Sequence, residues 1–322
     1  MSDNLKNKIW LIGTGQMAVD YFKVLNDLDL SFKVIGRGKA SSALFFETTG
    51  FKPFIGGLNK FLSTDPEKPS HAIVAVGAEE LTEITRQLLE KGIKNLLVEK
   101  PGGLDIRKIN DVVKIVNEKK ANVYIGYNRR FYASVIKAKK IIESDGGVSS
   151  FNFEFTEWSH IIEKLKKTNY IKEHWFLGNS THVIDLAFYL GGKPKKISSY
   201  SSGGLSWHPS ASIFSGAGVS ETGALFSYKA NWESAGRWGV EVLTKKNRLI
   251  FEPLEKLKIQ KRGNIEVEDV RDINYSLDEK YKPGLYNQIK SFLSQNRDLG
   301  CIDIASHLKM FEYYLKINPN HK

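Results

Sequence analysis

Lys100 is the residue whose type and position most favour chemistry in this sequence. It stands in Glu99-Lys100-Pro101, directly after the apolar run Leu96-Leu97-Val98, where a buried strand is expected to end. Most lysines are solvated surface charges, and three residues alone are weak evidence of a site. A lysine at the end of a buried strand, however, points into the space above the sheet. A cation fixed there can stabilise negative charge on a reacting oxygen.

A glycine-rich segment near the start of the chain predicts a nucleotide cofactor. The short apolar run 8–12 leads into Gly13-Thr14-Gly15-Gln16-Met17-Ala18, which fits the G-x-G-x-x-[GA] pattern and precedes apolar residues at helical spacing. Gly13 permits the tight turn, Gly15 lets the backbone approach a pyrophosphate, and Ala18 allows close packing of helix on strand. The phosphates would lie at the positive N-terminus of the helix. We therefore expect residues 13–17 to bind a dinucleotide.

The residues after the next strand, 32–35, favour NADP over NAD. An NAD-selective site usually has an Asp or Glu about 20 residues beyond the glycine motif. This chain has Gly36-Arg37-Gly38-Lys39-Ala40-Ser41-Ser42 instead. Arg37 can hold a 2′-phosphate by charge-assisted hydrogen bonds, helped by Lys39 and Ser41. NADP(H) is the predicted cofactor and NAD(H) stays possible, as does the alternative that Arg37 and Lys39 are only loop charges.

Alternating strands and helices position these residues. The apolar pattern predicts strands at 72–76, 95–98 and 123–126 and helices at 79–91 and 104–119. Elements of these lengths in this order predict a parallel, doubly wound sheet with its ligand site beyond the carboxyl ends of the strands. Lys100 lies on that edge.

Four segments together resemble the Gfo/Idh/MocA oxidoreductase family, which includes inositol dehydrogenases and glucose-fructose oxidoreductase. They are Gly13 to Ala18, Glu99 to Pro101, Gly126 to Phe131 and Gly178 to Leu186, in the family's order and at compatible separations across nearly the whole chain. The resemblance implies an N-terminal Rossmann domain and a C-terminal α+β domain with a largely antiparallel open sheet. It also implies hydride transfer between nicotinamide and a sugar or polyol carbon.

The resemblance implies roles for individual residues. Lys100 would contact the reacting hydroxyl, and His182 would act as acid and base. Asp185, one helical turn after His182, would help hold the substrate. The matched motifs imply further contacts, to substrate from Asn179, Tyr127 and Arg130 and to cofactor from Glu99.

The sequence departs from the family at one position. Many members carry an aspartate four residues before the histidine, whereas this chain has Gly178. Three alternatives stay open: the chain manages without this carboxylate, it borrows Glu173, or it has lost catalysis.

The second half predicts a substrate-binding and oligomerisation domain at 123–322, after a Rossmann domain at 1–122. Phe151, Phe153 and Phe155 alternate with polar residues and predict a strand at 148–157. The connection 158–177 contains Trp175 and the lysine cluster 164–167, which suit a charged sugar, although an anchored surface loop is an equal alternative.

Further elements are expected toward the C-terminus. Strands are predicted at 196–200, 223–232, 239–243, 248–251 and 256–260, while the Gly- and Ser-rich segment 201–222 leaves a hairpin and a mobile loop open. One face of this sheet is expected to pair with a second subunit, as in the family, which predicts a homodimer or homotetramer. Two helices within 285–317 are expected to pack back toward the Rossmann domain.

Composition narrows the class of protein. The net charge of the 322 residues is +11, but the lysines are dispersed, without zinc-finger spacing or a basic amphipathic helix, so neither nucleic acid nor membrane is an expected partner. Cys301 is the single cysteine, so no disulfide or thiolate metal cluster is expected, and no metal site is predicted. The polar start and the lack of any run of about 18 apolar residues predict a cytoplasmic protein.

The sequence thus predicts an NADP(H)-dependent oxidoreductase that acts on a secondary alcohol or ketone of a sugar, polyol or sugar derivative. One alternative is a non-catalytic dinucleotide-binding sensor or regulatory protein on the same scaffold, which the missing aspartate keeps open. A second is an enzyme that retains its cofactor through a sugar-modifying cycle.

Overall fold

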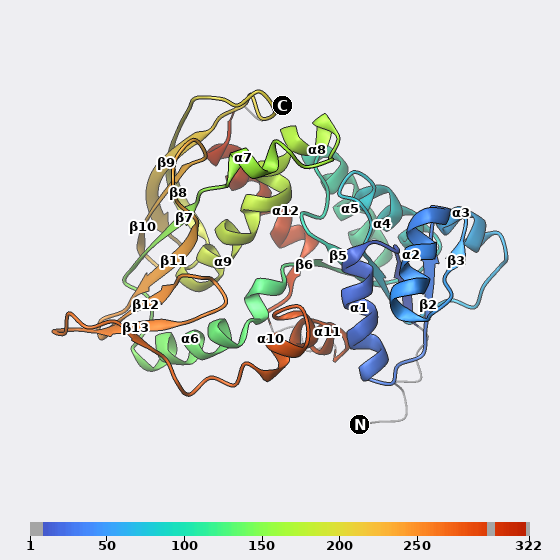
Figure 1. Cartoon of the computed structure of the whole chain (residues 1–322), viewed down its shortest axis with the longest axis horizontal. Coiled ribbons are helices and arrows are strands. Elements are labelled where there is room, and N and C mark those ends of the chain that lie inside the picture. Colours follow the sequence, from blue (N-terminus) through green and yellow to red (C-terminus); the bar gives the residue numbers. More distant parts are fainter. Residues whose placement is uncertain (1–8, 295–299, 320–322) are drawn as a thin grey trace. The chain divides into compact units, whose positions relative to one another are not determined.

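The computed structural model describes residues 9–294 and 300–319. The described residues form two compact units. The first contains the chain up to Asn128 and the segment Leu277–Leu308, and the second contains Arg129–Ser276 and the segment that begins at Lys309. Figure 1 shows the elements of both.

The first unit is built on a sheet with the strand order of a Rossmann fold. Within the described ranges the sheet has seven strands in the order β15-β6-β5-β4-β1-β2-β3. All neighbouring strands run parallel except β15, which pairs antiparallel with β6. The strands are β1 (Ile9–Ile12), β2 (Phe32–Gly36), β3 (Phe54–Ile55), β4 (His71–Val74), β5 (Asn95–Glu99), β6 (Asn122–Gly126) and β15 (Ile302–Asp303). The order reverses between β1 and β4, which places the ligand site of such a sheet at the carboxyl ends of these strands.

Helices cover this sheet because each has one apolar face. On α1, Tyr21, Phe22 and Leu25 are buried with strand residues such as Leu11 and Val34. Each fully buried side chain of this size contributes roughly 1.5–3 kcal/mol. The helices of this unit are α1 (Gln16–Asp27), α2 (Lys39–Thr49), α3 (Gly57–Leu62), α4 (Leu81–Glu90), α5 (Ile106–Lys119) and α11 (Leu285–Leu293).

The second unit is built on a mostly antiparallel open sheet. In the described part of the chain it has eight strands in the order β14-β13-β12-β11-β7-β10-β9-β8, and only β7 and β10 pair in parallel. The strands are β7 (Ser150–Phe155), β8 (Pro194–Ser202), β9 (Ile213–Ser220), β10 (Leu225–Asn231), β11 (Trp238–Leu243), β12 (Asn247–Phe251), β13 (Lys258–Lys261) and β14 (Glu268–Asp269).

One face of this sheet is aromatic and lies against α9 (Thr181–Gly191), which packs on β7 and β11. The parallel pairing of β7 with β10 places Phe151 beside Phe226 and Phe153 beside Tyr228, and both pairs of rings are stacked at 5.3 Å. Such cross-strand aromatic pairs fix the register of a sheet. The other helical segments are η2 (Asn128–Phe131), α6 (Ala133–Ser144), α7 (Ser159–Ile162), α8 (Asn169–Glu173) and η3 (Phe176–Ser180).

The predicted fold class is confirmed, with differences in detail. The segment 201–222 contains β9, which forms a hairpin with β8, so the hairpin alternative is the one observed. β6 pairs with β5 in the first sheet, and the first unit therefore continues to Asn128 instead of ending at residue 122. The helix α11 belongs to the first unit, and the division falls within α12 (Ile304–Ile317), while α10 (Ser276–Lys280) begins at the other division.

Candidate functional site

The turn after β1 borders a pocket of about 510 Å³, together with the loops after β2 and β4. Gly13 has φ +126°, and a Cβ there would lie 2.2 Å from the carbonyl oxygen of Ala75, so only glycine fits. At Gly15, which precedes α1, a Cβ would meet no atom within 4 Å, so the backbone is open to an approaching ligand. The lining of the turn is completed by Thr14, Gln16 and Met17. An accessible glycine backbone at the start of a helix fits the pyrophosphate of a dinucleotide.

Two of the three residues predicted to bind the 2′-phosphate line this pocket. Arg37 and Ser41 line it, and Ser41 accepts a hydrogen bond from the Thr14 hydroxyl at 3.1 Å. Lys39, the first residue of α2, is exposed and lies outside the pocket lining. Arg37 is therefore the cation best placed to meet a 2′-phosphate.

Glu80 is a pocket residue that the sequence did not single out. It precedes α4, lines the same pocket and forms an ion pair with Arg37, whose side chain is 75% exposed. A neighbouring hollow is lined by Arg37 together with Glu79, Glu80 and Glu83. The only sequence signal was a carboxylate shortly after the carboxyl end of β4, on the ligand-binding edge of the sheet. Glu80 competes with any bound anion for Arg37.

Lys100 directly follows β5 and is half-buried. Glu99 before it is buried and accepts a hydrogen bond of 2.7 Å from the Tyr21 hydroxyl on α1. Burial raises the pKa of Glu99, while the Tyr21 hydrogen bond and the nearby charge of Lys100 oppose this rise. On the other side, the carbonyl oxygen of Pro101 lies 2.7 Å from Nε2 of His307. The backbone on both sides of Lys100 is thus fixed by buried polar contacts.

His182 lies in the first turn of α9 and is 7% exposed, with its ring centroid 6.4 Å from that of Trp238. One turn later, Asp185 accepts two hydrogen bonds from the guanidinium of Arg130, at 2.7 and 2.6 Å. Burial opposes the charge of Arg130, but the Asp185 carboxylate outweighs this and raises the pKa of Arg130. The structure therefore brings two predicted substrate residues together as a buried pair that ties α9 to η2.

The buried carboxylate of Glu157 lies beside the turn that precedes α9, next to Gly178, where many family members have an aspartate. Glu157 follows β7, is 1% exposed, and accepts hydrogen bonds from Asn179 Nδ2 at 3.0 Å and from Ser180 Oγ at 2.9 Å. Asn179 and Ser180 belong to the π-helical turn η3, a distortion often found at functional sites. Burial raises the pKa of Glu157 to about 7, although Ser180 and Arg237 oppose the rise.

The sequence did not single out Glu157, and it named Glu173 in one of three alternatives for the missing carboxylate. Glu173 is exposed at the end of α8. Around Gly178 itself, a Cβ would meet no atom within 4 Å. The carboxylate that reaches this helix start is that of Glu157, which follows β7 and lies 22 residues before Asn179.

The remaining predicted substrate residues lie in different surroundings. Tyr127 is buried in the first unit, with its ring 5.7 Å from that of His307. Trp175 is half-buried and packs edge-to-face against Trp207 at 6.3 Å. The lysines at 164, 166 and 167 are exposed.

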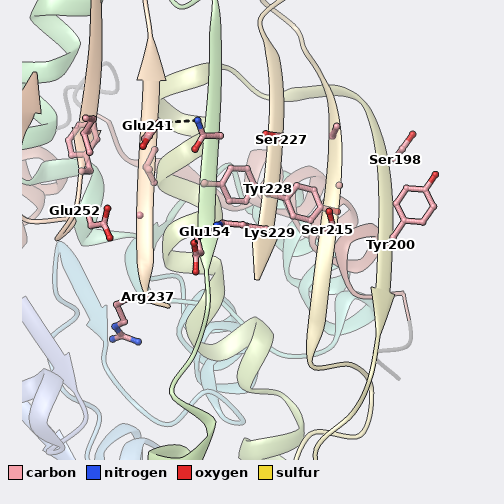
Figure 2. Close-up of a pocket in the computed structure, with 18 residues that line it drawn as sticks. Glu154, Ser198, Tyr200, Ser215, Ser227, Tyr228, Lys229, Arg237, Glu241 and Glu252 are labelled. Atoms are coloured by element: carbon pink, nitrogen blue, oxygen red, sulfur yellow. Dashed lines mark hydrogen bonds and ion pairs between the residues drawn. The ribbon is translucent and has the colours of Figure 1, made fainter. Parts of the chain in front are cut away.

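A larger pocket, of about 840 Å³, lies on the face of the second sheet opposite α9 (Figure 2). Figure 2 shows polar side chains from neighbouring strands along this face, among them Glu154, Ser227 and Lys229, with Tyr200 at the far edge. Glu241 on this face accepts a hydrogen bond from Asn152. The lining includes none of Lys100, His182 and Asp185. This pocket is therefore distinct from the residues that carry the predicted chemistry.

The glycine turn, the parallel strand order and the pocket at the carboxyl ends of β1, β2 and β4 define a dinucleotide-binding Rossmann domain. Residues 7–127 match the Gfo/Idh/MocA family, described as an oxidoreductase family with an NAD-binding Rossmann fold. The predicted resemblance is confirmed over this part of the chain, which is similar to the NAD-binding domain of that oxidoreductase family.

Solved structures of similar fold cover nearly the whole chain. UDP-N-acetylglucosamine 3-dehydrogenase GnnA from Acidithiobacillus ferrooxidans matches with a TM-score of 0.74 and 13% identity over 98% of this chain and 97% of that chain. The WlbA dehydrogenase from Chromobacterium violaceum, in complex with NADH and UDP-GlcNAcA, has a TM-score of 0.74 and 15% identity over 99% and 95%. Levoglucosan dehydrogenase in complex with NADH and L-sorbose has a TM-score of 0.79 and 16% identity over 98% and 96%.

A sequence search of the curated proteins found no match. Among the described residues, no helix is long and apolar enough to cross a membrane.

Proposed function

We propose that this protein is an NADP(H)-dependent oxidoreductase that interconverts a secondary alcohol and a ketone on a sugar, polyol or sugar derivative. The observation that carries the proposal is the position of Lys100 at the carboxyl end of β5, on the sheet edge where Gly13 to Met17 border the dinucleotide pocket. β5 and β1 run parallel to β4 between them, so their carboxyl ends share that edge. The substrate class is supported by structural neighbours whose names and ligands are UDP-sugars, levoglucosan and sorbose.

The bound nicotinamide would accept or donate the hydride. In the oxidative direction, His182 would take the proton of the substrate hydroxyl. The role proposed for Lys100 is to stabilise the negative charge that develops on the reacting oxygen. The buried pair of Arg130 and Asp185 fixes the helix that carries His182, and Glu157 holds the turn before it. We therefore assign Asn179 an indirect role, in which it holds the Glu157 carboxylate in place. Tyr127 and Trp175 remain proposed substrate contacts.

The preference for NADP(H) is proposed from Arg37 and Ser41 in the pocket lining. Glu80 weakens this preference because it already pairs with Arg37. NAD(H) remains the alternative cofactor, since two of the neighbouring structures contain NADH.

The sheet face shown in Figure 2 is the proposed contact between subunits of a homodimer or homotetramer. It is built from both charged and uncharged side chains, and Tyr200 on it is 73% exposed. Sedimentation of the purified protein would test this proposal, and a monomer at all concentrations would contradict it.

The function is tested with a panel of sugars, inositols and sugar nucleotides, followed by NADP(H) absorbance. We expect turnover of at least one member, and single-turnover hydride transfer should fall sharply in Lys100→Met. Undiminished turnover in this variant would contradict the role of Lys100. Cofactor binding without turnover on any panel member would favour a non-catalytic sensor, and cofactor that stays bound through purification and a full cycle would favour the retained-cofactor enzyme.

A further inference from the structure

Trp238, at the start of β11, lies within a group of cations near His182. The guanidinium carbon of Arg129 lies 4.9 Å from the centroid of its ring, and that of Arg237 lies 4.5 Å from it. Arg237 also lies 4.5 Å from the centroid of Trp158, which is itself partly exposed. Cation–π contacts hold both guanidinium groups against Trp238 at one end of the second sheet, where Arg237 also borders the pocket on the face opposite α9.

Arg237 is the cation of this group that already has an ion-pair partner. The carboxylate that faces Arg237 is Glu157, at 3.6 Å, and it also accepts hydrogen bonds from Asn179 and Ser180. The Nε atom of Arg129 is buried and has no hydrogen-bond partner among the described residues. Buried polar groups are nearly always paired, so an unpaired guanidinium nitrogen indicates a missing acceptor.

We propose that Arg129 and Arg237, held against Trp238 beside His182, form a subsite for an anionic group of the substrate, either a carboxylate or a phosphate. A planar guanidinium presents donors that match both groups bidentately. The inference rests on the proposed function and narrows its substrate to a sugar that carries a carboxylate or a phosphate. It assigns recognition of this negative charge to Arg129 and Arg237 and not to the exposed lysine cluster at 164–167.

The test is binding of four probes to the NADPH-loaded protein by isothermal titration calorimetry, in buffer free of phosphate and sulfate. The probes are neutral D-glucose, D-glucuronate as carboxylate, glucose 6-phosphate as monophosphate and UDP-N-acetylglucosamine as diphosphate. We expect at least one anionic probe to bind about tenfold or more tightly than glucose, because a charged hydrogen bond contributes this much. The best anionic probe identifies which of the two anions the subsite accepts.

Two variants localise the effect. Arg129→Gln should remove most of the difference between the anionic probe and glucose while leaving NADPH affinity unchanged. The control Lys166→Gln removes one exposed charge from the basic segment and should keep the difference, which separates a built subsite from the general positive charge of the chain.

The inference is overturned if no anionic probe binds more tightly than glucose to the unaltered protein, a comparison that does not depend on the folding of any variant. It is also overturned if a folded Arg129→Gln protein keeps the full difference. Anionic probes that bind but are never oxidised would contradict the proposed function and leave the subsite in place. Oxidation of neutral sugars without any preference for anionic ones would support the proposed function and overturn the subsite.

Discussion

The dinucleotide pocket is formed mainly by backbone groups, whereas the surroundings of His182 are formed by polar side chains. The pocket is made largely of backbone and glycine, and its main cation, Arg37, is exposed and paired with Glu80. On the helix of His182 and the turn before it, polar side chains are paired with one another, as in Arg130 with Asp185 and Glu157 with Ser180. Asp185, Glu157 and Ser180 are buried. A backbone-built site depends on main-chain conformation, whereas a buried side-chain network depends on each charge and hydrogen bond.

The largest effect is expected at His182 itself. His182→Ala should lower turnover by about 10² to 10⁴, because an oriented acid/base contributes this factor. Dinucleotide affinity should stay unchanged, since the pocket lining belongs to the first unit. Steady-state turnover and a fluorescence titration with NADPH measure the two separately. The matched control is His160→Ala, on the exposed surface of α7; an equal loss of turnover in both variants would remove His182 from its proposed role.

The backbone character of the pocket is tested by two glycine substitutions. Gly13→Ala forces a Cβ to within 2.2 Å of the Ala75 carbonyl oxygen at φ +126°, and should lower the free energy of unfolding by roughly 3 kcal/mol or more. Gly15 has φ −82°, and a Cβ added there would meet no atom within 4 Å. Gly15→Ala should therefore change the free energy of unfolding by less than about 1 kcal/mol, while dinucleotide binding weakens. Urea unfolding and NADPH titration of both variants measure these effects. Equal stability of the two proteins would mean that the turn relaxes around a side chain.

The two regions also differ in how much of them the sequence predicted. The turn Gly13 to Met17 and the position of Lys100 are local patterns, so motif and strand periodicity were sufficient. Glu157 could not be found because its partners lie on another element, and the same holds for Glu80, which meets Arg37 43 residues away. A single sequence gives spacing along the chain but not which side chains meet across a fold. The pairing of Arg130 with Asp185, both predicted separately, shows the same limit across 55 residues.

Burial of Glu157 predicts a pH dependence of stability in the second unit. Its pKa is raised from 4.5 to about 7, so the folded protein binds this proton more tightly than the unfolded chain. The resulting stability is fully present below about pH 4.5 and is lost as the pH rises to about 7, with an upper limit of about 3 kcal/mol. Glu157→Gln cannot titrate, so its free energy of unfolding should fall less than that of the unaltered protein between pH 5 and 7.

Urea unfolding at several pH values gives this comparison directly. The control is Glu173→Gln, an exposed carboxylate near the same turn, which should retain the pH dependence of the unaltered protein. If the Glu157→Gln curve follows the unaltered protein across the whole range, Glu157 is ionised in the folded state and its burial has been compensated.

The smallest effects are expected among the exposed charges of the cofactor pocket. Arg37→Gln should weaken NADPH binding by about tenfold and NADH binding much less, because only the 2′-phosphate needs the cation. Lys39→Gln, outside the pocket lining, should change NADPH affinity by no more than about twofold, as is usual for a solvated surface charge. Separate fluorescence titrations with NADPH and NADH measure both.

Since Glu80 competes for Arg37, Glu80→Gln should shift the ratio of the two affinities toward NADPH. Tighter binding of NADH than of NADPH to the unaltered protein would show that Glu80, and not Arg37, decides which cofactor this pocket accepts.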